Sequence, residues 1–253
     1  MRARKTSLAI IGGTGLNEFQ EGSVEQETQT PFGSISAPMI CSEREGTALV
    51  FLARHGSPHT IPPDKINYRA NMWALKNKGV TRVIGVNAVG GIHRDMPAGT
   101  IVVPDQLVDY SYGREHTFFD GNSYPGVDNE LSHIDFTFPF SESLRSSLIK
   151  ASENIHLSIV DKAVYAVTQG PRLETAAEIN RLEKDGSDIV GMTMMPEAAL
   201  ARELAIDYAS ICLVVNPAAG RSNSLITMQE IHQVIDTGMI KVRQLLEEVV
   251  KLV

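Results

Sequence analysis

Seven short apolar runs along the chain alternate with segments of helical periodicity. The runs are almost continuously hydrophobic, as strands covered on both faces are. They are LAIIG (8–12), ALVFLA (48–53), RVIGV (82–86), TIVVP (100–104), AVYAV (163–167), DIVGM (188–192) and ASICLVV (209–215). This alternation predicts one α/β domain over residues 1–253, with a central mixed β-sheet flanked by helices. The stretch 109–140 is aromatic, rich in Gly and Pro and weakly periodic, so we expect a loop with a functional or interface role.

Polar residues mark where the helices begin. We expect a helix over 65–78 with Asp64 as its N-cap, and T-x-x-E capping boxes at Thr175 and Thr227 predict the start of two more. Pro196 fits the first turn of another helix. After Thr227, apolar residues recur at three- and four-residue steps towards the end of the chain, which predicts a long amphipathic helix.

The composition limits the class of protein. The chain of 253 residues has a net charge of −7, which argues against a general nucleic-acid binder with a basic stripe. Two cysteines cannot form a disulfide framework, and Cys212, inside an apolar run, is expected in the core. The apolar stretch after the basic MRARKT is too short for a signal peptide, and no run reaches membrane length. We therefore expect a cytoplasmic protein that does not associate with membranes.

Small or polar residues follow six of the predicted strands. They are Gly13-Thr14, Arg54-His55, Asn87-Ala88, the run from Gln169 to Glu174, Met192-Thr193, and Asn216. Ligands of α/β sheets bind beyond the carboxyl ends of the strands. Six such ends together predict one composite site.

Two of these motifs suggest phosphate binding, although each also has a structural explanation. IIGGTGL (10–16) has Glu18 where the dinucleotide fingerprint needs a third glycine, so it is either a tight turn or a backbone nest that holds phosphate with the Thr14 hydroxyl. In LARHG (52–56), Arg54 can hold two phosphate oxygens or form an ion pair. His59 has no such argument and is assigned to the surface or the core.

Two further motifs allow the same two interpretations. Glu174 precedes a helix start, where it either stabilises the helix dipole or directs its carboxylate at a ligand N–H. The methionines of GMTMMPEA (191–198) fit a core, whereas Thr193 can add a hydroxyl to an anion site.

Taken together, these stretches resemble the trimeric purine nucleoside phosphorylase and methylthioadenosine phosphorylase family. The resemblance covers almost the whole chain, and it is carried by IIGGTGL, TPFG (30–33), LARHG, HTIPPDKINYRANMWAL (59–75), QGPRLET (169–175) and GMTMMPEA. The family cleaves a purine nucleoside with inorganic phosphate and releases the base and a pentose 1-phosphate. The resemblance implies no cofactor and no metal, with phosphate as co-substrate.

The resemblance also implies roles for single residues. The phosphate contacts are expected from Thr14, Arg54, His55, Ala88 and Thr193, and from Asn87, which stands where methylthioadenosine phosphorylases have a threonine. Met192 is expected against the ribose, and Leu173, Glu174 and Asn216 around the base. His133 matches a histidine that enters the neighbouring subunit's site, which implies a homotrimer. Arg54, His55 and Asn216 are the expected catalytic residues, acting by positioning and electrostatics.

Three positions favour a 6-oxopurine over a 6-aminopurine. Adenosine-type members end the strand after YASI (208–211) in Asp-x-Asp, where this chain has Asn216 and Ala218. Ala218 cannot accept from a 6-amino group, whereas Asn216 can donate to O6 or N7. Glu174 can accept from the N1–H of hypoxanthine or guanine but would face the N1 lone pair of adenine. An unpaired buried polar group costs about 1–3 kcal/mol, so we expect strong discrimination.

Met228 is expected to contact the 5′ end of the substrate. It stands where 6-oxopurine phosphorylases have a histidine that bonds the 5′-hydroxyl. A thioether cannot donate a hydrogen bond but packs well against another thioether. Both ends together predict phosphorolysis of 5′-methylthioinosine. The alternatives are an inosine/guanosine phosphorylase, a methylthioadenosine phosphorylase and a non-catalytic purine nucleoside sensor.

Overall fold

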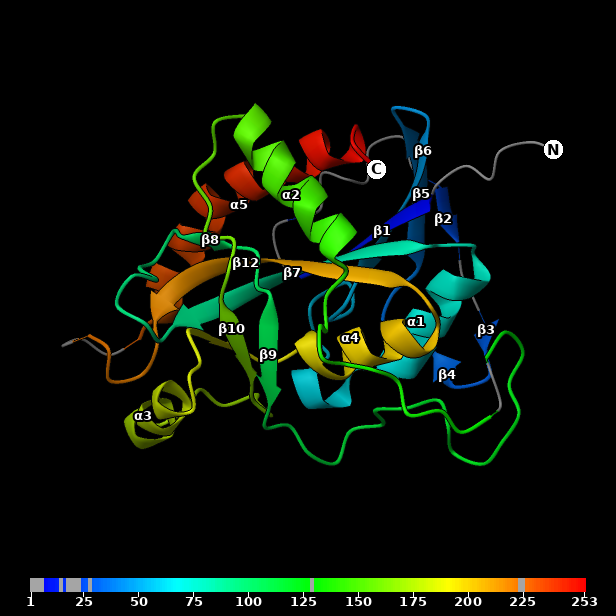
Figure 1. The fold of residues 1–253 in the computed structure, drawn as a ribbon, viewed down its shortest axis with the longest axis horizontal. Coiled ribbons are helices and arrows are strands. Elements are labelled where there is room, and N and C mark those ends of the chain that lie inside the picture. The colour runs from blue at the N-terminus through cyan, green and yellow to red at the C-terminus, as the bar shows by residue number, and fades with distance from the viewer. Residues whose placement is uncertain (1–6, 14–15, 17–23, 27–28, 128–129, 223–225) are drawn as a thin grey trace.

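The computed structural model describes residues 7–13, 16, 24–26, 29–127, 130–222 and 226–253, with the side chains of 24–26 left out. Thr14 and Glu18 lie outside this part of the chain. Figure 1 shows the arrangement of the elements.

The described strands and helices follow one another along the chain. The strands are β1 (Ser7–Gly12), β2 (Val24–Gln26), β3 (Gln29–Thr30), β4 (Gly33–Ser34), β5 (Met39–Arg44), β6 (Thr47–Ala53), β7 (Arg82–Gly91), β8 (Ile101–Val102), β9 (Gln106–Asp109), β10 (Val164–Val167), β11 (Ile189–Gly191) and β12 (Asp207–Pro217). The α-helices are α1 (Tyr68–Asn77), α2 (Glu142–Asn154), α3 (Ala176–Lys184), α4 (Met194–Glu203) and α5 (Met228–Val250).

The main sheet is mixed, which confirms the predicted fold class. Its order is β2-β5-β6-β1-β7-β11-β10-β9, and β12 pairs with both β7 and β8. The pairs β1–β6, β1–β7, β12–β7 and β10–β11 are parallel, whereas β11 runs antiparallel to β7. Strand β7 is therefore the centre of the sheet, and it contacts β1, β11 and β12.

Helices cover both faces of the sheet (Figure 1). Residues of α1 and α4, such as Met72 and Leu200, share one hydrophobic cluster, and residues of α2 and α5, such as Leu148 and Leu245, share another. Along β1 the side chains alternate between these two clusters. A strand buried on both faces reads as a continuous apolar run, which is why the sequence revealed it. Cys212 is buried, as predicted.

Two predicted boundaries and one predicted capping box need correction. The first predicted helix begins at Tyr68, and its N-cap is Asn67 rather than Asp64, because the Asn67 carboxamide oxygen accepts from the Ala70 N–H at 3.1 Å. The strand predicted to end at residue 86 continues to Gly91, since β12 pairs with it over its whole length. Asn87 therefore lies inside a strand rather than after one.

The third correction concerns the second capping box. At Thr175 both reciprocal hydrogen bonds are present. At Thr227 the hydroxyl accepts from the Glu230 N–H, but the Glu230 carboxylate accepts from that hydroxyl instead of from the Thr227 N–H. Thr227 is still the N-cap of α5.

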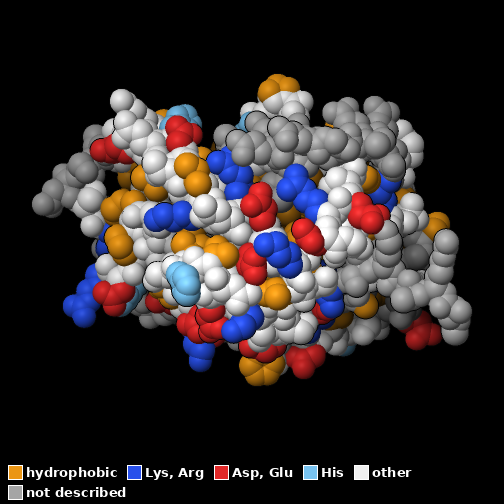
Figure 2. All heavy atoms as spheres, turned by 90° about the horizontal axis from the view of Figure 1, so that it is seen from above, with side chains coloured by type: hydrophobic (Ala, Val, Ile, Leu, Met, Phe, Trp, Pro, Cys, Tyr) orange, Lys and Arg blue, Asp and Glu red, His pale blue; other side chains and the backbone are white. Residues whose placement is uncertain are grey.

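The expectations from composition concern the distribution of surface charge and the hydropathy of the helices. On the face in Figure 2, basic and acidic side chains are interspersed. No helix in the described part of the chain is long and apolar enough to span a bilayer.

Candidate active site

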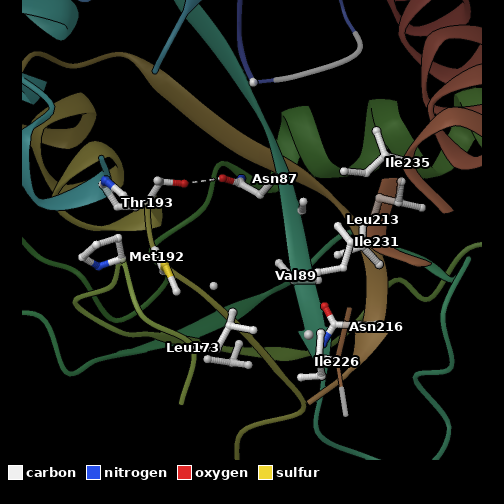
Figure 3. Close-up of a pocket in the computed structure, with 18 of the residues that line it drawn as sticks. Asn87, Val89, Leu173, Met192, Thr193, Leu213, Asn216, Ile226, Ile231 and Ile235 are labelled. Carbon is white, nitrogen blue, oxygen red and sulfur yellow. Dashed lines mark hydrogen bonds between the residues drawn. The ribbon is translucent and has the colours of Figure 1, made fainter. Parts of the chain in front are cut away.

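A cavity of about 330 Å³ lies between the strands at the centre of the sheet and the N-terminal half of α5. Eleven of the predicted site residues line it, and they are Arg54, His55, Asn87, Ala88, Leu173, Glu174, Met192, Thr193, Asn216, Ala218 and Met228. Figure 3 shows several of them converging on the cavity from β7, β12 and the turns after β10 and β11. The composite site predicted from the strand ends is therefore present in the structure.

Arg54 is buried beneath the cavity and forms an ion pair, one of its two predicted roles. Its Nε donates to one oxygen of the Glu197 carboxylate at 2.7 Å and its Nη2 to the other at 2.8 Å. Its Nη1 and Nη2 also donate to the carbonyls of Val86 and Ile11. The Tyr208 hydroxyl donates to Glu197 at 2.8 Å. These bonds hold four of the five Arg54 N–H groups and leave one on Nη1 for a ligand.

Asn87 organises the polar wall of the cavity. Its carboxamide oxygen accepts from the Thr193 hydroxyl at 2.6 Å, and its Nδ2 donates to the Ser210 hydroxyl at 2.8 Å (Figure 3). Ser210 in turn donates to the Gly85 carbonyl at 3.0 Å. The chain of hydrogen bonds fixes Thr193, which begins α4, against the central strand. Thr193 is the N-cap of α4, but the backbone of α4 is non-helical at Met195, so the regular helix begins only after that residue.

His55 is held in one tautomer. Its Nδ1 lies 2.8 Å from the Ile61 carbonyl, which can only accept, so Nδ1 carries the hydrogen. Burial and the positive charge of Arg54 lower the pKa of His55 to about 4. Nε2 is therefore a hydrogen-bond acceptor at neutral pH.

His59, assigned to the surface or the core, is exposed and also borders the cavity. Its ring stacks on His55 with centroids 4.3 Å apart, and it lines the cavity.

Glu174 lies in the turn between β10 and α3, and a hydrogen bond from Thr168 orients its carboxylate. The Thr168 hydroxyl donates to Glu174 Oε1 at 2.6 Å, which leaves Oε2 available to a ligand. Gly170, in the same turn, has φ +62°, and a Cβ there would lie 2.4 Å from the Met192 sulfur. Glycine is needed at this position both for its backbone conformation and for the close approach of Met192.

A β-bulge in β12 turns Asn216 towards the cavity. The register with β7 shifts between Val214 and Asn216, so that Asn216 lies opposite Gly90 while Leu213 lies opposite Ala88. These four residues therefore share a face, and all of them line the cavity. The Asn216 Nδ2 donates one hydrogen to the Pro217 carbonyl at 2.7 Å, and its second hydrogen remains for a ligand.

Met228 lies in an apolar wall that the sequence revealed only in part. The wall also includes Ile231, Ile235 and Met239 of α5, and Ile226, which lies just before that helix. Figure 3 shows Ile231 and Ile235 beside Leu213, and Ile226 beside Asn216. The helical period of these residues indicates a buried face, but it cannot separate a face on a core from a face on a cavity.

Two predicted residues are not brought into the cavity by the structure. Thr14 lies outside the described residues, although Gly13 before it lines the cavity. His133 is exposed in the stretch 109–140 and is not among the lining residues of its own chain. Glu197, Thr168 and Ser210 were not predicted. Glu197 stood in a motif already singled out, and a buried cation at residue 54 calls for an acidic partner.

Comparisons with known proteins show the family of this chain. A model of the Phosphorylase superfamily matches residues 7–251. A probable S-methyl-5′-thioinosine phosphorylase from Pseudomonas syringae pv. tomato is 52% identical over 96% of this chain and 98% of its own length. The 6-oxopurine nucleoside phosphorylase of Pyrococcus furiosus is 41% identical over 97% of this chain and 90% of its own. The structure of methylthioadenosine phosphorylase from Schistosoma mansoni with adenine superimposes with a TM-score of 0.91 at 33% identity, over 98% of this chain and 92% of that one.

Proposed function

This chain belongs to the phosphorylase superfamily, and from that membership we propose that it cleaves S-methyl-5′-thioinosine with inorganic phosphate to hypoxanthine and 5-methylthioribose 1-phosphate. The enzyme is then a pentosyltransferase of purine salvage. The observation that carries the choice of substrate is a single cavity with Glu174 and Asn216 in its wall and an apolar surface around Met228.

The polar groups of the cavity support a 6-oxopurine. Glu174 keeps one carboxylate oxygen for the N1–H of hypoxanthine, because Thr168 occupies the other. Asn216 keeps one N–H for O6 or N7. Ala218 is buried in the same wall and offers no acceptor to a 6-amino group. A guanine base satisfies the same three conditions.

The apolar wall supports a 5′-methylthio group. Ile231 and Ile235 offer no hydrogen-bond partner to a 5′-hydroxyl, and Met228 offers only a weakly accepting sulfur. Burying a hydroxyl without a partner costs about 1–3 kcal/mol. A methylthio group gains from the same contacts, since thioethers pack readily into irregular apolar space.

The chemistry needs positioning and charge rather than a covalent enzyme intermediate. A phosphate oxygen forms a bond to C1′ while the C1′–N9 bond breaks, and the electron pair of that bond goes to the purine, which then takes up a proton. Phosphate beside Thr193, Asn87, Ala88 and His55 stabilises the oxocarbenium character of the sugar, and Asn216 stabilises the charge on the leaving base. Arg54 contributes its one remaining N–H, because its charge is paired with Glu197. Phosphate is the co-substrate, and no metal or cofactor takes part.

The assembly we propose is a homotrimer in which His133 completes the site of a neighbouring subunit. The exposure of His133, outside the cavity of its own chain, supports this assignment. Size-exclusion chromatography with light scattering measures the oligomeric state, and a monomer with full activity would exclude this role.

A second candidate is an inosine or guanosine phosphorylase, which the likeness to the Pyrococcus enzyme favours. It differs from the first only at the 5′ end of the substrate. The base would be read by the same Glu174 and Asn216.

One assay separates these candidates. Phosphate-dependent release of base is measured with methylthioinosine, inosine and methylthioadenosine, and kcat/KM is compared. We expect methylthioinosine to be preferred. A preference for inosine supports the second candidate, equal cleavage of methylthioadenosine contradicts the base assignment, and tight nucleoside binding without turnover indicates a sensor.

A further inference from the structure

Arg114 is a buried arginine that the proposed reaction does not use. It lies in the irregular stretch 109–140 and is 9% exposed. Its N–H groups donate to six oxygen atoms. Four are the carbonyls of Thr168 (3.2 Å), Gln169 (2.8 Å), Met192 (2.8 Å) and Met195 (2.6 Å), and the others are the side-chain oxygen of Gln169 (3.2 Å) and the Tyr68 hydroxyl (3.5 Å). All five donors of the guanidinium are therefore engaged.

Apart from the Tyr68 hydroxyl, these oxygen atoms belong to two segments that end neighbouring strands. Thr168 and Gln169 follow β10 and lead to Glu174, whereas Met192 and Met195 follow β11 and flank Thr193. Nη2 holds the first segment and Nη1 holds the second. One rigid, planar group thus spans the segment that reads the base and the segment that faces sugar and phosphate.

The partners of Arg114 point to a geometric role rather than a stabilising charge pair. Among the described residues Arg114 forms no salt bridge with a carboxylate, in contrast to Arg54 with Glu197. Burial of a cation among neutral carbonyls carries a desolvation cost. A lysine can supply three donors from one point, but it cannot reproduce a fork that reaches two segments at once.

We propose that Arg114 is a positioning residue for substrate selection, which sets the distance between Glu174 and the Met192–Thr193 turn. The inference rests on the proposed function of the cavity. Arg114 touches neither base nor phosphate and acts through the two backbone segments. It also makes the stretch 109–140 part of the site's support, so that a movement of this stretch changes how the base is read.

Arg114→Lys tests the proposal against two matched arginines. Arg145→Lys changes another buried arginine that donates to carbonyls, those of Pro104 and Asp161. Arg145 also pairs with Glu142, and it does not line the cavity. Arg202→Lys loosens the same stretch elsewhere, because Arg202 donates to the carbonyls of Asp135 and Phe138. For each variant we measure the melting temperature and kcat/KM with methylthioinosine and methylthioadenosine.

We expect Arg114→Lys to raise the KM for nucleoside and to lower the preference for methylthioinosine by roughly tenfold or more, because a displacement of about 1 Å can cost about a hundredfold in rate. Both control variants should keep the preference of the wild type even if they melt at a lower temperature. If Arg114→Lys melts lower but keeps its preference, the proposal is wrong and the residue is only structural.

The proposal can still be tested if the variant does not fold or if the wild type has no activity. If Arg114→Lys does not fold, Arg114→Gln replaces it, and an unchanged preference in that variant also overturns the proposal. If the wild type cleaves none of the nucleosides, the proposed function fails. The preference for hypoxanthine over adenine, measured by calorimetric binding to wild type and variants, then tests Arg114 on its own.

Discussion

The guanidinium of Arg54 and the carboxylate of Glu197 form a two-pronged ion pair in which both side chains are 2% exposed. Removal of one partner from a buried pair leaves an uncompensated charge and costs about 3–5 kcal/mol. We expect Glu197→Gln to lower the free energy of unfolding in urea by about this amount and to reduce turnover.

A matched control is Tyr208→Phe, which removes only the hydroxyl that donates to Glu197 at 2.8 Å. It should cost about 1.5–3 kcal/mol, the usual size for one hydrogen bond to a charged group. If both variants lose the same stability, the charge of Glu197 is not what holds Arg54.

His55 gives the protein a defined pH dependence. Burial and Arg54 lower the pKa of His55 to about 4, below the value of an unfolded histidine. The unfolded chain therefore binds more protons between pH 6.5 and 4, and stability falls as the pH falls through this range. One site with this pKa accounts for at most about 3.5 kcal/mol, at about 1.4 kcal/mol per pKa unit.

The measurement is urea unfolding between pH 4 and 7 for the wild type and for His55→Gln. We expect the pH slope to be smaller in the variant. His232→Gln, on the exposed side of α5, serves as the control and should leave the slope unchanged.

The identity of the base depends on residues 216, 218 and 174. We expect Asn216→Asp with Ala218→Asp to raise the ratio of kcat/KM for methylthioadenosine over methylthioinosine. A carboxylate at position 218 accepts from the 6-amino group, and one at position 216 meets N7. Glu174→Ser should increase the gain, since the three residues share one ligand and their effects couple. An unchanged ratio in the triple variant would show that the selectors lie elsewhere.

The 5′ end is tested at Met228, which is 61% exposed and tolerates substitution without loss of core packing. Met228→His supplies a donor to a 5′-hydroxyl, and we expect it to shift the kcat/KM ratio towards inosine by about tenfold, which corresponds to about 1.4 kcal/mol. Gln229→His, one residue along and outside the cavity, is the control. If the two substitutions have equal effects on the kcat/KM ratio, Met228 does not contact the 5′ end of the substrate.

Helix α5 approaches β12 closely at Gly238. A Cβ there would lie 2.6 Å from the methyl groups of Leu213, which lines the cavity. Gly→Ala in an exposed helix stabilises by about 1 kcal/mol. Here we expect Gly238→Ala to lower the melting temperature and raise the KM for nucleoside, because either the Leu213 side chain shifts or the helix moves away from the strand. A more stable variant with unchanged KM would contradict the close contact.

Sequence patterns located the strands that are buried on both faces but missed the half-buried ones. Strand β5, with the sequence MICSER, is apolar at its start and polar after it, and it forms through antiparallel pairing with β6. Such pairing depends on a partner strand, and no local period records it. The same limit explains why β7 was predicted to end at residue 86.

Most of the cavity followed from the rule that ligands gather beyond strand ends, but its supporting contacts did not. Thr168 and Ser210 are common residues in unremarkable positions, and only the fold brings them to Glu174 and Asn87. The apolar wall was hidden for another reason. Ile231 and Ile235 continue the helical stripe that packs on the core further along α5, so they looked like core residues.

The residues assigned to the base and those assigned to the 5′ substituent come from different parts of the chain. The groups assigned to base and phosphate lie on strands and on the turns that follow them, whereas the groups assigned to the 5′ substituent come mainly from residues 226–239. An exchange of the C-terminal segment between two relatives should therefore transfer the sugar preference and leave the base preference behind. The preference for the 5′ substituent can therefore change through substitutions in the C-terminal segment, without a change in the preference for the base.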